Sequence, residues 1–384
     1  MRSLLTLTVA ATLLTACDQS PTATTGDAVL STSPLASSSD NGPRTSSVRW
    51  NRTAMALFRA RGGGAGRVNA YVSVAQYRAA LAADDARHGH YRPSLAGAVA
   101  AASVVVLKRF YPLDAASIDA ELAAQRAEPP RGSEHNKDFE AGESIGNQIG
   151  AAVLALASSD NFGLTSPGVP PVGPGRWVSS AAPIVRGGLG ARPFFLSSGS
   201  ELRLPPPPAF GSAAFLSALA EVRAFSDGRT AEQVAISRKW VPFSGVVFNG
   251  VATDLIDKYH RKELEAARIL AYANTAAFDA IIACFDTKFT YWFIRPTQAD
   301  AGITLAVGLP NHPSYPAAHS CESGAFQGVL TDAFPSERAY LDAVAQEASM
   351  SRVFGGIHYR FDVEGGLSIG HSAARLALER RGLE

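Results

Sequence analysis

The chain of 384 residues has little net charge, little charge of either sign and no long apolar run in its main part. Lysine and arginine number 35 against 34 aspartate and glutamate, so the net charge of +1 offers no basic surface of the kind that binds nucleic acid. Beyond the N-terminus, the most apolar run covers 95–107, shorter than the roughly 20 residues that a membrane-spanning helix needs. We therefore expect neither a nucleic-acid partner nor a membrane-spanning helix in the mature protein.

The N-terminus is predicted to be a processing signal. Arg2 precedes an apolar run from Leu4 to Leu14, which is too short to span a bilayer, and Ala16-Cys17 follows. A small residue before cysteine resembles the bacterial lipoprotein box, so residues 1–17 are interpreted as a lipoprotein-type signal peptide with Cys17 as the lipidated residue. An ordinary secretory signal with a chance cysteine is the alternative. In both cases we expect export, facing the periplasm or the cell exterior. Under the lipoprotein interpretation, the anchor at Cys17 is the only membrane contact.

Composition predicts two further segments. Residues 18–47 are rich in serine, threonine, alanine and proline, which indicates a flexible tether. Residues 48–384 are expected to form one all-α domain of two packed helical bundles, because alanine recurs periodically and 46% of residues are hydrophobic. The motifs described below place its site in 286–384. Two proline-rich stretches, 166–174 and 204–208, are predicted to be non-helical. The predicted helices lie near 50–60, 68–87, 94–110, 114–127, 136–158, 211–225, 230–239, 244–285, 286–295, 316–333, 337–352 and 358–381.

Three short segments of the last hundred residues share one kind of chemistry. They supply three fixed cations, two imidazoles and one carboxylate, a combination that suits a bound phosphate or a close mimic of it. Taken singly, each residue is better explained as a surface charge, a helix-start charge or a loop histidine, and only the joint pattern favours a site. The segments are Lys288-x6-Arg295-Pro296, Pro316-Ala317-Ala318-His319, and Ser351-Arg352-x5-His358-x3-Asp362.

Spacing predicts how the first two segments are arranged. Lys288 and Arg295 are seven residues apart, which on a helix puts them on one face, two turns apart. Pro296 is expected to end that helix. Pro316 suits the first turn of a new helix, where its missing N–H costs nothing. The backbone amides of Ala318 and His319 would then point outward at a helix N-terminus and bind an anion.

The third segment predicts a helix, a glycine bend and a second helix. Arg352 would end the first helix, and His358 would start the second after Gly355-Gly356. Four residues separate His358 from Asp362, so the carboxylate can bind the second nitrogen of the imidazole and fix its tautomer.

These motifs resemble the signature of the superfamily of vanadium-dependent haloperoxidases and type 2 phosphatidic acid phosphatases, and the chain is similar to its bacterial secreted members. The resemblance implies that His358 bonds vanadium in a haloperoxidase or takes a phosphoryl group in a phosphatase. It also implies that Asp362 orients His358 and that His319 is the acid/base group. The residues expected to bind the vanadate or phosphate are Lys288, Arg295, Ala318, His319 and Arg352.

The chain departs from that signature at two positions. Ala317 and Ala318 stand where the family has serine and glycine, so one hydroxyl donor to the oxyanion is missing. His312 lies seven residues before His319, at a position that is histidine in the bromoperoxidases of the family. His312 is therefore either a halide-site residue or an ordinary loop histidine.

The resemblance leaves three functions open. The first is a vanadate-dependent haloperoxidase that uses hydrogen peroxide to oxidise a halide, bromide rather than chloride, to hypohalous acid, which attacks a small organic acceptor. The second is a secreted acid phosphatase that hydrolyses phosphate esters through a phosphohistidine and needs no vanadate. The third is a weakly catalytic oxyanion-binding lipoprotein. Chain length, the proline-rich middle and His312 favour the first.

Two cysteines are expected beside the site. Cys284 lies one helical turn before Lys288, and Cys321 lies two residues after His319. In an oxidising compartment they could pair, and two free buried thiols are an equally acceptable interpretation.

Overall fold

The structure, a computed structural model, describes residues 45–384 apart from 63, 130–133, 135–136, 181 and 243. The chain divides into two units, 1–36 and 37–384, and every described residue lies in the second. The predicted signal peptide, Cys17 and nearly all of the predicted tether therefore lie outside the described residues. The last two tether residues, Ser46 and Ser47, already form the first turn of a helix.

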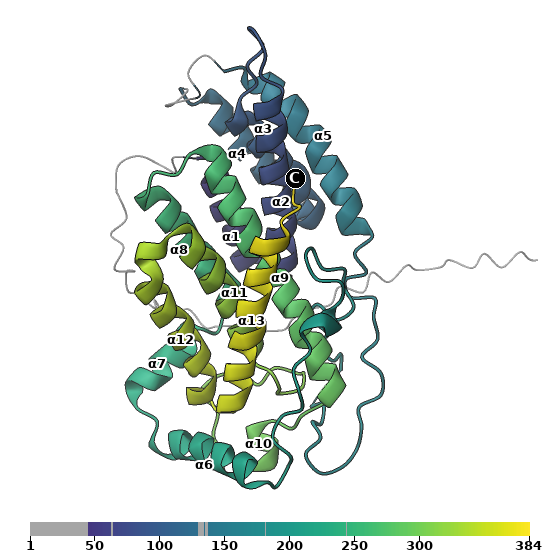
Figure 1. Ribbon diagram of the computed structural model, residues 1–384, viewed down its shortest axis with the longest axis vertical. Helices are drawn as coiled ribbons and strands as arrows, with labels where there is room; N and C mark the ends of the chain where they lie inside the picture. The colour runs from purple at the N-terminus through teal and green to yellow at the C-terminus, as the bar shows by residue number, and fades with distance from the viewer. Residues whose placement is uncertain (1–44, 63, 130–133, 135–136, 181, 243) are drawn as a thin grey trace, which may run out of the picture. The chain divides into compact units, whose positions relative to one another are not determined.

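The all-α prediction is confirmed. Within the described residues there is no β-strand, and pairing between extended segments is limited to isolated bridges. The elements are shown in Figure 1. They are α1 (Ser46–Arg61), α2 (Ala65–Asp85), α3 (Leu95–Phe110), η1 (Pro112–Asp114), α4 (Ala115–Ala127), α5 (Phe139–Ser158), η3 (Gly199–Leu202), α6 (Ala213–Gly228), α7 (Ala231–Lys239), α8 (Ser244–Lys258), α9 (Glu263–Tyr291), α10 (Pro296–Ala299), α11 (Ala318–Ala333), η4 (Pro335–Glu337), α12 (Arg338–Phe354) and α13 (Arg360–Arg380).

The helices of this unit form two groups, as predicted. In the first group α2, α3 and α5 pack on one another, and in the second α9, α11 and α13 do so, with α12 against α11. Contact between α2 and α9 joins the two groups into one core (Figure 1). The predicted site lies at one end of the second group, because α9 and α12 end there and α11 and α13 begin there.

Glycine allows close approach in each group. A Cβ atom on Gly146 of α5 would lie 2.2 Å from the carbonyl oxygen of Ala98 on α3. On Gly370 of α13, it would lie 2.4 Å from the carbonyl oxygen of Cys321 on α11. Only a residue without a side chain fits at either contact. The second contact sets the spacing of the two helices that follow the two histidine motifs.

Two helix boundaries were predicted wrongly. The predicted helix 244–285 is divided into α8 and α9 by a turn in which His260 has a φ of 51°. The predicted helix 286–295 does not exist as such, because α9 continues to Tyr291 and ends at Trp292, which adopts the left-handed conformation. Arg295 is extended and Pro296 begins α10, so this proline starts a helix instead of ending one. The non-glycine residues at both left-handed positions hide these breaks from sequence analysis.

Helix α9 also corrects the expectation about membrane spans. Among the described residues it is the one helix that is long and apolar enough to cross a membrane by length and composition. However, 89% of its apolar window is buried inside the protein. Because α9 is covered by α2, α11 and α13, its apolar character is explained by its central place in the core.

The segment between α5 and α6 is mostly irregular, and Asp279 attaches it to α9. The Asp279 carboxylate accepts three backbone N–H bonds, from Phe194 at 2.8 Å, Phe195 at 2.7 Å and Leu196 at 3.2 Å. Burial raises the pKa of Asp279 to about 7, although these three bonds act in the opposite direction. Asp279 thereby satisfies three amides that would otherwise be buried without acceptors.

We predict that Asp279→Ala lowers the free energy of unfolding by about 3 kcal/mol or more, because several buried N–H groups lose their acceptor at once. Urea denaturation followed by circular dichroism measures this change. The matched control is Asp286→Asn on the same helix, whose carboxylate pairs with the partly exposed Arg203 and should contribute less than about 1 kcal/mol. Equal losses in the two variants would contradict the anchoring role of Asp279.

Candidate active site

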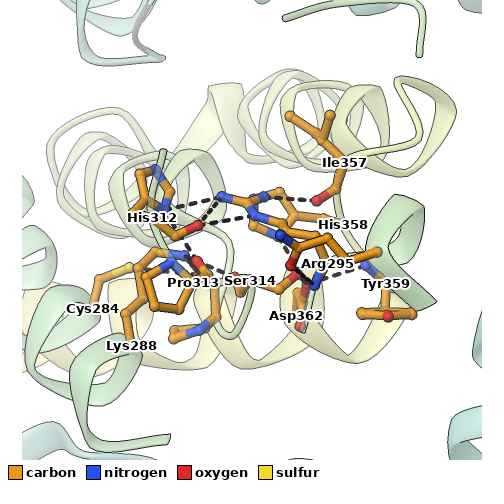
Figure 2. Close-up of polar contacts among 12 residues, drawn as sticks. Cys284, Lys288, Arg295, His312, Pro313, Ser314, Ile357, His358, Tyr359 and Asp362 are labelled. Carbon is orange, nitrogen blue, oxygen red and sulfur yellow. Dashed lines mark hydrogen bonds and ion pairs between the residues drawn. The ribbon is translucent and has the colours of Figure 1, made fainter. Parts of the chain in front are cut away.

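The predicted site residues come together at the end of the second helix group. Lys288 lies in the last turn of α9, and Arg295 lies between α9 and α10. Arg352 lies in the last turn of α12, and His358 and Asp362 flank the start of α13. The irregular segment 312–317 runs between them, and Figure 2 shows its first three residues, His312, Pro313 and Ser314, beside Lys288 and Arg295.

His358 is held by the carboxylate predicted to hold it. Its Nδ1 lies 2.8 Å from Asp362 Oδ2, and both side chains are buried. Because the carboxylate accepts, Nδ1 carries the proton and Nε2 presents its lone pair. Nε2 faces Nη1 of Arg295 at 3.0 Å (Figure 2). Burial and then the charges of Arg295 and Lys288 lower the pKa of His358 well below its usual value, so the ring is neutral.

Asp362 is itself fixed by two further donors. Its Oδ2 accepts from the Ser314 hydroxyl at 2.5 Å and from the Tyr359 amide at 3.1 Å. Burial raises the pKa of Asp362 to about 6, while the Ser314 bond and the charge of Lys288 act to lower it. Ser314 was not predicted as a site residue, because it lies outside the three motifs.

Arg295 is completely buried, although not on the helical face that was predicted. Nη1 donates to the Ile357 carbonyl at 2.7 Å, and Nε and Nη2 donate to the His312 carbonyl at 3.1 and 3.0 Å. Burial lowers the pKa of Arg295 to about 10, which leaves it charged at neutral pH. The guanidinium therefore joins the His358 turn to the 312–317 segment.

Lys288 is also completely buried, and backbone carbonyls surround its ammonium. Nζ donates to Pro313 O at 2.9 Å, to Ser314 O at 2.7 Å and, by a shorter contact, to Pro316 O. Burial lowers the pKa of Lys288 to about 8. In addition to its charge, Lys288 thus has a structural role that was not predicted, because it holds the 313–316 segment in place.

Arg352 and His319 are both attached to the end of α7. Arg352 donates from Nη2 to Ser237 O at 2.7 Å and from Nε to the Ser351 hydroxyl at 2.9 Å. His319 Nε2 lies 2.8 Å from Trp240 O. Burial and then the charge of Arg352 lower the pKa of His319 to about 3, so this imidazole is neutral at working pH.

The N-terminus of α11 forms the remaining side of the site. The helix begins at Ala318 with Ala317 as its N-cap, and Pro316 precedes the cap instead of lying in the first turn as predicted. The Ala317 methyl provides no side-chain cap, and its N–H donates to the Asp362 carbonyl at 2.8 Å. The amides of Ala318 and His319 are first-turn groups, which have no acceptor within a helix.

His312 lies in the loop before α11, and its side chain is buried beside Arg295. Its Nδ1 lies 3.0 Å from Nη2 of Arg295, and its ring meets the ring of Phe285 edge-on, 5.2 Å between centroids. Burial and the charges of Lys288 and Arg295 lower the pKa of His312 well below its usual value.

The donor set fits a tetrahedral oxyanion such as vanadate or phosphate. Within the described part of the chain, none of the ion pairs to a carboxylate involves Lys288, Arg295 or Arg352, although all three are buried. Lys288 and Arg295 have the carboxylate of Asp362 as their common acidic neighbour, and a bound anion would offset the cost of the excess positive charge of the three buried cations. Among the same residues no three His, Cys, Asp or Glu side chains gather to hold a metal ion. One imidazole nitrogen among cationic donors is instead suited to an oxyanion.

Comparison with known proteins agrees with this chemistry. Residues 268–381 match the family model of the PAP2 superfamily. No curated protein matches the chain. Among solved structures, a bacterial vanadium-dependent iodoperoxidase is similar with a TM-score of 0.74 and 23% identity, over 88% of this chain and 96% of that one.

A holo-type bacterial vanadium-dependent chloroperoxidase is similar with a TM-score of 0.64 and 16% identity, over 86% of this chain and 92% of that one. The resemblance stated from the motifs is thereby confirmed. The chain carries a PAP2 superfamily segment at residues 268–381, within an all-α domain that has the fold of the bacterial vanadium-dependent haloperoxidases.

Proposed function

We propose that this domain is a vanadate-dependent haloperoxidase that oxidises a halide with hydrogen peroxide to hypohalous acid. The observation that carries the proposal is the state of His358, a neutral ring whose Nε2 lone pair faces a buried guanidinium. The fold supports the same choice, since the similar solved structures are an iodoperoxidase and a chloroperoxidase.

In this proposal His358 Nε2 bonds the vanadate, and Asp362 keeps the ring in the required tautomer. Arg352 would donate to the anionic oxygens, and Arg295 would do so with the Nη1 group that faces His358 Nε2 in this structure. The charge of Lys288 and the Ala318 amide would add to the same field. Bound vanadate would supply Lewis-acid activation of peroxide without changing its own oxidation state. His319, whose ring is fixed by the Trp240 carbonyl, is the group that exchanges a proton beside the oxyanion.

Burial of the site favours the haloperoxidase over the phosphatase. Lys288 and Arg295 have no exposed surface and His358 is 3% exposed. A haloperoxidase keeps its oxyanion through many turnovers, whereas a phosphatase admits an ester and releases phosphate in every cycle. Donors buried to this extent are better suited to keeping a bound oxyanion than to releasing it in every cycle. The phosphatase remains the second candidate because the same donors and the unprotonated Nε2 of His358 also suit a phosphohistidine, as the PAP2 match allows.

His312 supports bromide rather than chloride as the substrate. Its imidazole lies between the Arg295 guanidinium and the Phe285 ring, which together offer a cationic and polarisable environment. Such surroundings favour the larger and more readily oxidised halides. Iodide is therefore also expected as a substrate, with chloride the poorest of the three.

We predict that His358→Ala abolishes vanadate binding. Removing a residue that only orients a metal ligand can lower affinity roughly hundredfold, and removing the ligand itself should cost more. Isothermal titration calorimetry with orthovanadate measures the affinity. The matched control is His371→Ala on the exposed side of the same helix, α13, which should bind as the unmodified protein does. Unchanged affinity in His358→Ala would show that another group binds the vanadium.

We predict that Ala317→Ser has two separate effects. A serine at the N-cap of α11 can accept a first-turn N–H and stabilise the protein by about 1 kcal/mol. Its hydroxyl also restores a donor to the oxyanion, so affinity for vanadate or turnover should rise. One such donor can stabilise the transition state by up to about 3 kcal/mol.

Thermal denaturation and calorimetry read the two effects independently. Ala333→Ser is the control, because it adds the same hydroxyl at the opposite end of α11 from the site. A stabilised variant with unchanged affinity would mean that the hydroxyl does not reach the oxyanion.

The decisive experiment compares two activities of one preparation lacking residues 1–17. After loading with orthovanadate, the protein should brominate a phenolic dye with peroxide and bromide near pH 6, and phosphate should compete. Iodide and chloride are assayed alongside. Hydrolysis of a phosphate ester without vanadate, together with negligible halogenation when loaded, would establish the phosphatase instead. Inactivity in both assays with vanadate bound would establish the oxyanion-binding protein.

A further inference from the structure

Glu322 is a buried carboxylate beside the site that has no part in the function proposed above. It lies on α11, one helical turn after His319. Burial raises the pKa of Glu322 to about 7, because removal from water disfavours the charged form of a carboxylate. Its titratable neighbours are Cys284 and Cys321, two buried free thiols. A buried carboxylate is costly unless hydrogen bonds offset the cost, so its partners indicate its role.

Two donors bind Glu322, and both come from the start of α8. Its Oε2 accepts from the Ser244 hydroxyl at 2.7 Å and from the Gly245 amide at 3.0 Å. These are the first two residues of α8, where backbone amides have no acceptor within the helix. The carboxylate on α11 therefore caps a different helix, and it fixes the point at which the chain from α7 enters α8.

The start of α8 and the end of α7 in turn hold His319. Ser244 Oγ lies 3.2 Å from the His319 carbonyl oxygen, and because it has one proton to donate, Glu322 and this carbonyl share it. The Trp240 carbonyl lies 2.8 Å from His319 Nε2, which therefore carries the ring proton. Trp240 is buried and its indole N–H donates to Glu347 at 2.8 Å. The place of His319 thus depends on Trp240 and Ser244.

We propose that Glu322 is a positioning residue for His319, which acts through Ser244 and the adjoining end of α7 to fix the imidazole beside the oxyanion. Glu322 acts through other residues and is not itself a reacting group. The inference rests on the proposed function in one respect, that His319 exchanges a proton at the oxyanion. A displacement of about 1 Å in such a group can lower the rate roughly hundredfold, so the carboxylate has a catalytic effect beyond stability.

Glu263 offers a matched control far from the site. This partly buried carboxylate lies in the first turn of α9 and accepts from the amides of Ser46 and Ser47 at 2.6 and 2.8 Å. Those residues are the first two of α1, so Glu263 also caps a different helix. Lys288 lies near the other end of α9, roughly 37 Å away at about 1.5 Å per residue. Removal of Glu263 therefore reports the loss of such a cap without a change near His319.

The kinetic test uses the full-length chain loaded with vanadate. Glu322→Ala should lower kcat for halogenation by up to about a hundredfold. Vanadate affinity, measured by calorimetry, should change far less, because His358 and the arginines that would hold the oxyanion lie on other elements. Glu322→Gln should restore most of the activity, since its amide oxygen can accept the same two bonds. Glu263→Ala should lower the melting temperature and leave kcat unchanged.

A double variant tests whether the effect passes through His319. If Glu322 acts by placing this imidazole, Glu322→Ala should cause no further loss of kcat in a His319→Ala background. A purely structural carboxylate would lower the activity of both backgrounds by the same factor.

Nuclear magnetic resonance tests the placement of the ring without vanadate and without turnover. A buried imidazole N–H that donates to a carbonyl is protected from exchange with water and gives its own proton signal. The signal of His319, assigned by its loss in His319→Ala, should be present in the wild type and in Glu322→Gln. It should be lost in Glu322→Ala and weakened in Ser244→Ala, a milder change. Circular dichroism verifies that each variant folds.

An unchanged His319 signal in folded Glu322→Ala and Ser244→Ala would overturn the proposal. So would a full further loss of kcat in the His319→Ala background, or an equal fall of kcat in Glu263→Ala. If the wild type neither halogenates nor hydrolyses phosphate esters, the proposed function fails, and the His319 signal then decides alone whether Glu322 positions this ring.

Discussion

Backbone carbonyls that solvate buried cations are the constraint on which this structure depends. Lys288 donates to three carbonyls of the 313–316 segment, Arg295 to those of His312 and Ile357, and Arg352 to that of Ser237. A carbonyl inside a helix is already an acceptor for the helix, so it is less available to a cation. The cluster therefore requires helix ends and breaks nearby. The end of α7, the irregular segment before α11 and the turn after α12 provide them.

The same constraint explains why the site lies where helices end. The cations need irregular backbone because its carbonyls are available as acceptors. The neutral imidazoles need hydrogen-bond partners that hold their rings in place. Asp362 combines both requirements, since its carboxylate binds His358 and the Ser314 hydroxyl of the irregular segment. Its backbone carbonyl accepts from Ala317 and so joins α13 to the start of α11. The histidine motifs are thus coupled through one residue.

Much of the fold and the identity of the site residues were predictable from the sequence, because both depend on local spacing. Asp362 lies four positions after His358, a spacing that at the start of a helix puts the two side chains in contact. The relation of Lys288 to Arg295 was not predictable, since it depends on Trp292 adopting a left-handed conformation that tertiary contacts impose. Carbonyl acceptors such as Ser237 O and Trp240 O have no sequence signature. Ser314 was also missed, because its hydroxyl binds Asp362, a residue far away in the sequence.

The glycine contact between α11 and α13 has a consequence for how such a site can diversify. Because Gly370 lies against the Cys321 carbonyl, the separation of the two helices is set by direct backbone contact. The distance between the histidines at the starts of these helices is therefore set by the packing of the core. The connections that surround the site do not determine this distance. The long irregular segment before α6 can then change in length or sequence while the spacing of the two imidazoles is preserved.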